Sequence, residues 1–124
     1  MPVTWERDDA RRLFTGRGTG VLAAEDLLPA VPTRSGEYRT YRMLFDVRGA
    51  TTSVMGADIR RVVANVRSAS SKEGPRGPVA IVADDPAFFG MARMYETICE
   101  HADLDNVRVF NSLDQATHWL GLES

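Results

Sequence analysis

The sequence predicts an α/β fold: a mixed five-stranded sheet with an N-terminal antiparallel hairpin, three later parallel strands and about four helices. Two observations support this prediction. After residue 40, strand-sized apolar runs alternate with longer segments of helical periodicity, which is typical of parallel strands joined by right-handed crossovers. Near the N-terminus, two short strand-like runs are separated only by a turn signal, which indicates an antiparallel pair. Residues 1–124 are expected to form a single domain.

The N-terminal part begins with two predicted strands, residues 3–6 and 13–17. Asp8 and Asp9 stand between them, and their side chains favour a turn because they bond neighbouring backbone amides. A brief helix is predicted over residues 25–31, because its apolar residues share one helical face and the proline that follows discourages continuation. The chain is therefore expected to open with a hairpin and one short helix.

A polar loop over residues 33–38 leads to a strand predicted at residues 41–47. Its apolar side chains run consecutively, as they do in interior strands that are covered on both faces. Residues 59–69 are apolar at helical spacing and charged on the opposite side, which predicts an amphipathic helix. Ser53 stands shortly before this helix and is a candidate for its N-cap.

Two further pairs of strand and helix complete the chain. A buried strand is predicted at residues 79–83, and Asp85 followed by proline is a helix-start signal. A short strand is predicted at residues 107–110. Ser112 then opens a final helix as the first residue of a capping box, and Gly121 ends it. This order places three parallel strands after the hairpin.

Composition predicts a soluble, cytoplasmic protein. The net charge is −2, and neither half of the chain is strongly basic, so nucleic acid is not an expected partner. Cys99 is the single cysteine and cannot form an internal disulfide, which makes a reducing compartment the default. No run approaches the roughly 20 apolar residues that a membrane span requires.

Patterns that would indicate catalysis, a cofactor or a metal all have simpler structural explanations. The alternating glycines between Gly16 and Gly20 do not lead directly into a helix, as a dinucleotide fingerprint requires, and are better explained as the end of a twisted edge strand. Cys99 is expected to be a buried packing residue, and His101 and His118 are expected on solvated helix faces. We therefore predict no enzyme activity, no cofactor and no metal site.

The sequence resembles a known family in its order of elements and in two runs. These runs are Leu-Phe-Asp-Val-Arg-Gly at residues 44–49 and Phe-Gly-Met-Ala-Arg-Met at residues 89–94. The pattern is similar to STAS domains, and more closely to the small bacterial SpoIIAA-like proteins. The likeness covers essentially the whole chain but consists of hydrophobic blocks and turns. It implies a non-enzymatic binding or regulatory module that acts through protein–protein contacts.

The best-known members of that family are anti-anti-sigma factors, in which phosphorylation of a serine controls binding to a kinase. An ungapped match to the family pattern places Gly56 at the phospho-acceptor position, so the motif is absent. Thr51, Thr52 and Ser53 lie nearby and offer a displaced acceptor. These three residues are candidates for a surface that contacts a regulatory protein partner.

Aromatic and methionine side chains crowd the segment after residue 85. They outnumber what one buried stripe of a helix holds, and Phe89 and Met94 are the expected extras on its surface. The leading hypothesis is a non-enzymatic binding or regulatory module that forms a homodimer and uses the region of Phe89 and Met94, together with residues 51–53, as its contact surface. An alternative is a carrier of a small lipophilic ligand, because sequences of this family also resemble lipid-transfer domains of the Sec14 kind. A third hypothesis is an enzyme whose site is assembled from distant residues.

Overall fold

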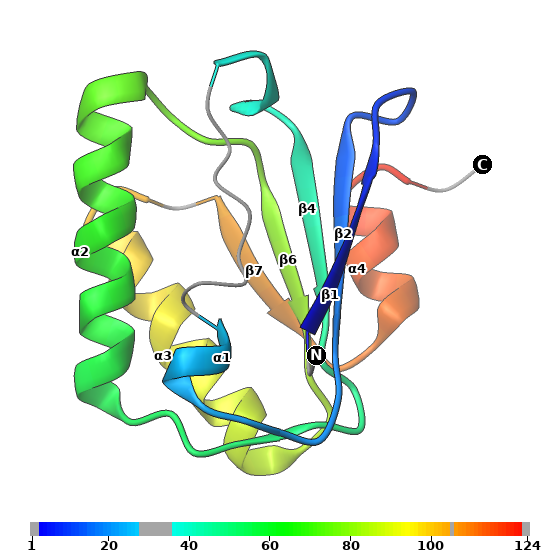
Figure 1. Ribbon diagram of the computed structural model, residues 1–124, viewed down its shortest axis with the longest axis vertical. Coiled ribbons are helices and arrows are strands. Elements are labelled where there is room, and N and C mark those ends of the chain that lie inside the picture. The colour runs from blue at the N-terminus through cyan, green and yellow to red at the C-terminus, as the bar shows by residue number, and fades with distance from the viewer. Residues whose placement is uncertain (1–2, 28–35, 105, 123–124) are drawn as a thin grey trace.

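The computed structural model describes residues 3–27, 36–104 and 106–122 and confirms the predicted α/β fold (Figure 1). Five strands form a sheet in the order β1-β2-β4-β6-β7, in which β1 and β2 are antiparallel and the other neighbours are parallel. In chain order the elements are β1 (Val3–Asp8), β2 (Leu13–Gly18), β3 (Val21–Leu22), α1 (Ala24–Leu27), a 3-10 helix (Gly36–Tyr38), β4 (Arg42–Asp46), β5 (Thr51–Thr52), α2 (Gly56–Glu73), β6 (Val79–Val82), α3 (Pro86–His101), β7 (Val107–Phe110) and α4 (Leu113–Trp119).

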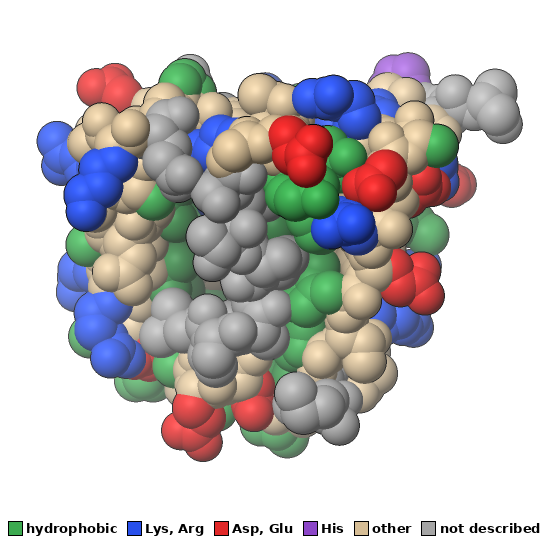
Figure 2. Space-filling model, turned by 45° about the horizontal axis from the view of Figure 1, so that its top comes forward, with side chains coloured by type: hydrophobic (Ala, Val, Ile, Leu, Met, Phe, Trp, Pro, Cys, Tyr) green, Lys and Arg blue, Asp and Glu red, His purple; other side chains and the backbone are tan. Residues whose placement is uncertain are grey.

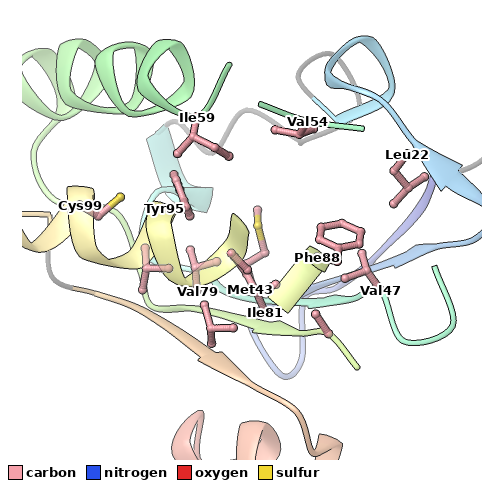
Figure 3. Close-up of a cluster of buried hydrophobic side chains, with 14 of the residues drawn as sticks. Leu22, Met43, Val47, Val54, Ile59, Val79, Ile81, Phe88, Tyr95 and Cys99 are labelled. Atoms are coloured by element: carbon pink, nitrogen blue, oxygen red, sulfur yellow. The ribbon is translucent and has the colours of Figure 1, made fainter. Parts of the chain in front are cut away.

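Helices cover both faces of the sheet and create two hydrophobic clusters. On one face α2 and α3 pack side by side, and α4 packs on the other face against β4, β6 and β7 (Figure 1). The larger cluster lies under α2 and α3 and includes Phe88, Tyr95 and Cys99 from α3 (Figure 3). All four residues of β6 are buried, as the predicted interior strand requires.

The smaller cluster lies under α4, and its buried members are Leu13, Leu44, Ala80, Val82, Ala116 and Leu120.

Helix starts follow the sequence signals with one exception. The Asp85 carboxylate accepts a hydrogen bond from the Phe88 amide at 3.0 Å and caps α3. The predicted cap at Ser53 is wrong, because α2 begins two residues later with Met55 at the N-cap. Asp58 explains the shift: its carboxylate accepts the Met55 amide at 3.0 Å, so a side chain inside the first turn satisfies the amide that precedes the helix.

The final helix follows its predicted signals. Ser112 caps α4 by accepting a hydrogen bond from the Gln115 amide at 3.4 Å. Gly121 follows the helix with a φ of 72°, a left-handed conformation that glycine adopts without steric penalty.

The sequence suggested that the strand carrying Gly16 and Gly18 is an edge strand, and the structure shows that this prediction is wrong. β2 lies between β1 and β4, and β1 forms the edge instead. Gly16 is required there because a Cβ at this position would lie 2.5–2.8 Å from the Trp5 ring, which crosses over it. The indole also stacks on Phe45, with ring centroids 5.2 Å apart. The glycine therefore allows an aromatic side chain to lie flat across the hairpin.

Some predicted boundaries are shorter in the structure or fall outside its described residues. The helix predicted at residues 25–31 appears as α1 over Ala24–Leu27, and residues 28–31 lie outside the described residues. The same holds for residues 33–35 of the predicted loop, whose last residues form the 3-10 helix. β3 and β5 form a small parallel pair that the sequence did not predict. In the described part of the chain, no helix is both long and apolar enough to cross a bilayer.

Candidate functional site

The loops that follow β2, β4 and β6 meet at one end of the sheet, at the bottom of Figure 1. These are the carboxyl ends of parallel strands, where open α/β sheets bind their ligands. The pairing of β3 with β5 brings Val21 opposite Thr51 and Leu22 opposite Thr52 at this end. Thus two segments far apart in sequence form one loop surface.

Two large apolar side chains are exposed at this end of the molecule. Val21 is 67% exposed and Met55 is 66% exposed. Val21 pairs with Thr51, and Met55 follows four residues after Thr51 along the chain. We call Val21, Thr51, Ser53 and Met55 the end surface. Neither Val21 nor Met55 was predicted from the sequence. At Met55 the available signal is that an apolar residue stands just before a helix, where its side chain has no place in the interior.

The three predicted hydroxyl residues have different surroundings. The Thr52 hydroxyl donates a hydrogen bond to the Leu22 carbonyl at 2.6 Å and accepts one from the Val54 amide at 3.1 Å. Its role is therefore to hold β5 against β3. Thr51 and Ser53 are exposed and belong to the end surface. The structure thus separates a structural threonine from two accessible hydroxyl groups.

Phe89 and Met94 are less exposed than the sequence analysis expected. Both are partly buried and pack against the larger cluster. The sulfur and methyl group of Met94 lie 3.6 and 3.7 Å from the place where Gly56 would carry a Cβ, which puts the thioether beside the start of α2 at ordinary contact distance. α3 also contacts β5. Met94 therefore lies next to the end surface, and neither residue forms its exposed part.

A charged cluster occupies the same end of the sheet, on the face of α4. Asp46 at the end of β4 is 6% exposed, and its carboxylate accepts hydrogen bonds from the Arg48 side chain at 2.8 and 2.9 Å. Arg17, opposite Asp46 in β2, adds a third charged contact at 2.8 Å. Burial by itself raises the pKa of Asp46, but the hydrogen bonds from Arg48 and the two guanidinium charges outweigh it and hold the pKa below its usual value. The cluster ties β2 to β4.

Replacing Asp46 with Asn is expected to lower the free energy of unfolding by about 2 kcal/mol at neutral pH. The folded-state pKa of Asp46 lies below the unfolded value. Its contribution is therefore present above the unfolded pKa of about 4 and is lost as the pH falls through the folded value. Urea unfolding near pH 7 and near pH 3 measures this, and the difference between wild type and variant should shrink at the lower pH. An unchanged difference would contradict the prediction, and the exposed Glu37→Gln variant serves as control.

An open groove of about 590 Å³ runs between α2 and α3. Arg60, Arg67 and His101 line it together with Val63, Ala64, Ser68, Ser71, Ile98 and Ala102. The Nδ1 atom of His101 lies 2.9 Å from the Thr97 carbonyl, which orients the ring on its own helix. The groove is thus partly basic, and it lies along the helices rather than among the strand-end loops of Figure 1.

Cys99 and the two histidines lie where the sequence placed them. Cys99 is fully buried, and burial raises the pKa of its thiol. His101 and His118 are both exposed, on α3 and α4 respectively. Within the described ranges, no group of three His, Cys, Asp or Glu side chains could hold a metal ion. A buried, protonated thiol is a poor nucleophile, so Cys99 acts as a packing residue.

The sequence matches no protein-family model, and no curated protein matches it either. The resemblance to SpoIIAA-like proteins consequently stays a prediction that rests on the pattern of elements. The end surface, with its exposed apolar and hydroxyl side chains, is therefore interpreted from its own geometry and chemistry.

Proposed function

We propose that this protein is a non-enzymatic binding module, of the SpoIIAA-like kind, that contacts a regulatory protein partner through the end surface. The observation that carries the proposal is the exposure of Val21 and Met55 at the carboxyl end of the parallel strands. Elsewhere in the described chain, large apolar side chains are buried or partly buried. Exposed apolar side chains on a loop surface can contribute to a protein contact site.

The size of the apolar contribution indicates a transient contact. Fully burying one exposed side chain of this kind contributes about 1.5–3 kcal/mol. Because Val21 and Met55 are 67% and 66% exposed, their further burial contributes about 2–4 kcal/mol together before the entropy cost of association. Contacts by Phe89 and Met94 at the margin can add to this value. A small surface of this kind suits a reversible regulatory interaction.

Thr51 and Ser53 give this surface a means of control. Both are exposed and stand on either side of the structural Thr52. A phosphate on either hydroxyl would add about two negative charges beside the apolar side chains and oppose their burial. These residues replace the acceptor that the family pattern would place at Gly56. The resemblance to partner-switching proteins supports this regulatory role.

The alternative of a lipophilic carrier has less support from the geometry. A carrier needs an enclosed and predominantly apolar cavity. The groove between α2 and α3 is open and includes Arg60, Arg67 and His101 in its lining. The exposed apolar residues of the end surface suit a flat protein contact better than an enclosed ligand.

Site-specific photocrosslinking tests the proposed contact. A photoreactive amino acid at Met55 should give a discrete adduct in cells of the native host, whereas the same residue at the exposed Arg108 of β7 should not. The partner identified by mass spectrometry is then purified. We expect the double variant Val21→Asp/Met55→Asp to bind it at least tenfold more weakly than wild type, with unchanged circular dichroism. Absence of a Met55-specific adduct, or unchanged affinity, would refute the function proposed here.

A further inference from the structure

The two edges of the sheet differ in how their backbone groups are satisfied. At the β7 edge, the buried Glu96 of α3 accepts a hydrogen bond from the Val109 amide at 2.6 Å. Its other oxygen accepts one from Arg93 at 2.8 Å. The amides of Val79 in β6 and of Ala83 just after it donate to the carbonyls of Asn106 and Phe110. Because backbone groups alternate between the two sides of a strand, the Val109 amide points away from β6 and toward Glu96. Another strand could pair with the middle of β7 only if this carboxylate were displaced from the Val109 amide.

Among the described residues, no strand pairs with the outer edge of β1. All residues of Val3–Asp8 pair with β2 in an unbroken register without a bulge. The Arg42 amide donates to the carbonyl of Arg12, which directly precedes β2. Because backbone groups alternate between the two sides of a strand, the even-numbered residues of β2 direct theirs toward β4. The odd-numbered residues consequently bond to Thr4, Glu6 and Asp8 of β1.

The remaining residues of β1, which are Val3, Trp5 and Arg7, therefore direct their backbone groups outward. No residue within 3–27, 36–104 or 106–122 bonds to these backbone groups. Such a row of donors and acceptors is a template for another extended chain.

We propose that β1 pairs antiparallel with β1 of a second copy of this protein, across a two-fold axis at Trp5, and forms one continuous sheet. The occupant follows from the difference between the edges. Because Glu96 holds the Val109 amide in the middle of the β7 edge, head-to-tail pairing of β1 with β7 of the next copy would have to break this hydrogen bond. Pairing of β1 with β1 is then the way for two sheets to join, and it closes at two copies. This interface is independent of the end surface.

The side chains of β1 select the register. With the axis at Trp5, Val3 of one copy lies opposite Arg7 of the other, so all outward backbone groups find partners. Thr4 then lies opposite Glu6. An axis at Glu6 or at Arg7 would place like charges directly opposite each other, which is destabilising.

The neighbouring side chains leave the edge accessible. The Trp5 ring leans inward over Gly16 and Phe45 and does not obstruct the axis. The Arg7 guanidinium lies 4.7 Å from the centroid of the Tyr38 ring, which holds this charge over the sheet face instead of in front of the edge.

A proline substitution at an outward amide tests the pairing. Arg7→Pro removes one outward donor per copy, and the proline φ is compatible with an edge strand. Arg7→Ala is the matched control, because it removes the side chain and keeps the amide. Sedimentation equilibrium should show a dimer for wild type and for Arg7→Ala, and a dissociation constant at least tenfold higher for Arg7→Pro. A monomeric wild type, or equal dimer affinity for the two folded variants, would overturn the proposal.

Disulfide crosslinking tests the register and does not depend on the folding of the proline variant. A Thr4→Cys chain mixed with a differently tagged Glu6→Cys chain should form a crosslinked heterodimer under mild oxidation, because these residues face each other across the axis. Each variant alone should crosslink much less. Preferential crosslinking of Glu6→Cys with itself, or absence of the heterodimer, would contradict pairing at Trp5.

Discussion

Substitution of Gly77 by alanine is expected to lower the free energy of unfolding by about 3 kcal/mol, a large effect for a single methyl group. Gly77 is buried where the loop after α2 crosses the start of β4. A Cβ there would fall well inside contact distance of the carbonyl oxygens of Thr40 and Tyr41. The obstacle is backbone rather than a flexible side chain. The Gly77 amide also donates to the Arg39 carbonyl at 2.9 Å, so the chain cannot shift without loss of that bond.

The same substitution at Gly90 should have the opposite sign. Gly90 is exposed within α3, and a Cβ there meets no atom within 4 Å. Alanine restricts the unfolded chain and favours the helix, so the free energy of unfolding should rise by about 0.5–1 kcal/mol. Urea titration followed by circular dichroism measures both variants. If Gly77→Ala and Gly90→Ala changed the free energy of unfolding equally, the close backbone contact at Gly77 would not be the reason that a side chain is excluded there.

Phe88→Ala is expected to lower the free energy of unfolding by about 3–5 kcal/mol. Phe88 is 6% exposed and lies with Leu22, Val47 and Val54 in the larger cluster (Figure 3). These neighbours come from different segments of the chain, so the ring joins the β3 and β5 region to α3 and the sheet. Its removal leaves a cavity that this set of separate elements cannot readily close.

The adjacent residue provides a matched control for this prediction. Phe89→Ala removes the same number of atoms from a partly exposed position and should cost about 1 kcal/mol. Thermal and urea unfolding of the two variants give the comparison. If Phe89→Ala were the more destabilising, the face of α3 that packs on the sheet would be assigned incorrectly.

The surface of the intact protein shows why the site could be predicted only in part. Figure 2 shows charged side chains mainly around the outside of one face, with Lys and Arg prominent along its left side, and apolar side chains gathered toward the middle. Residues 51–53 were correctly placed beside the start of a helix. The exposed apolar residues are Val21 and Met55 rather than the predicted Phe89 and Met94. The prediction rested on the crowding of apolar side chains along one helix. Met94 packs inward beside Gly56 at the start of α2, and only the packed structure shows that contact.

Local chemistry in the sequence determined the fold class and most element boundaries. Asp85 and Ser112 carry their own capping oxygens, the apolar run of β6 is buried, and that of β4 is buried except for the partly buried Phe45. These signals act over a few residues, so they can be read from the sequence without knowledge of the fold.

The tertiary structure alone decided which groups meet across the chain. It placed β2 inside the sheet, joined Val21 to Thr51, brought Glu96 to the edge of β7, and left the outer edge of β1 without a strand partner among residues 3–27, 36–104 and 106–122. Each of these contacts joins residues brought together by sheet order and packing. The sequence contains both partners in every case, but their proximity depends on the folding of the segments between them.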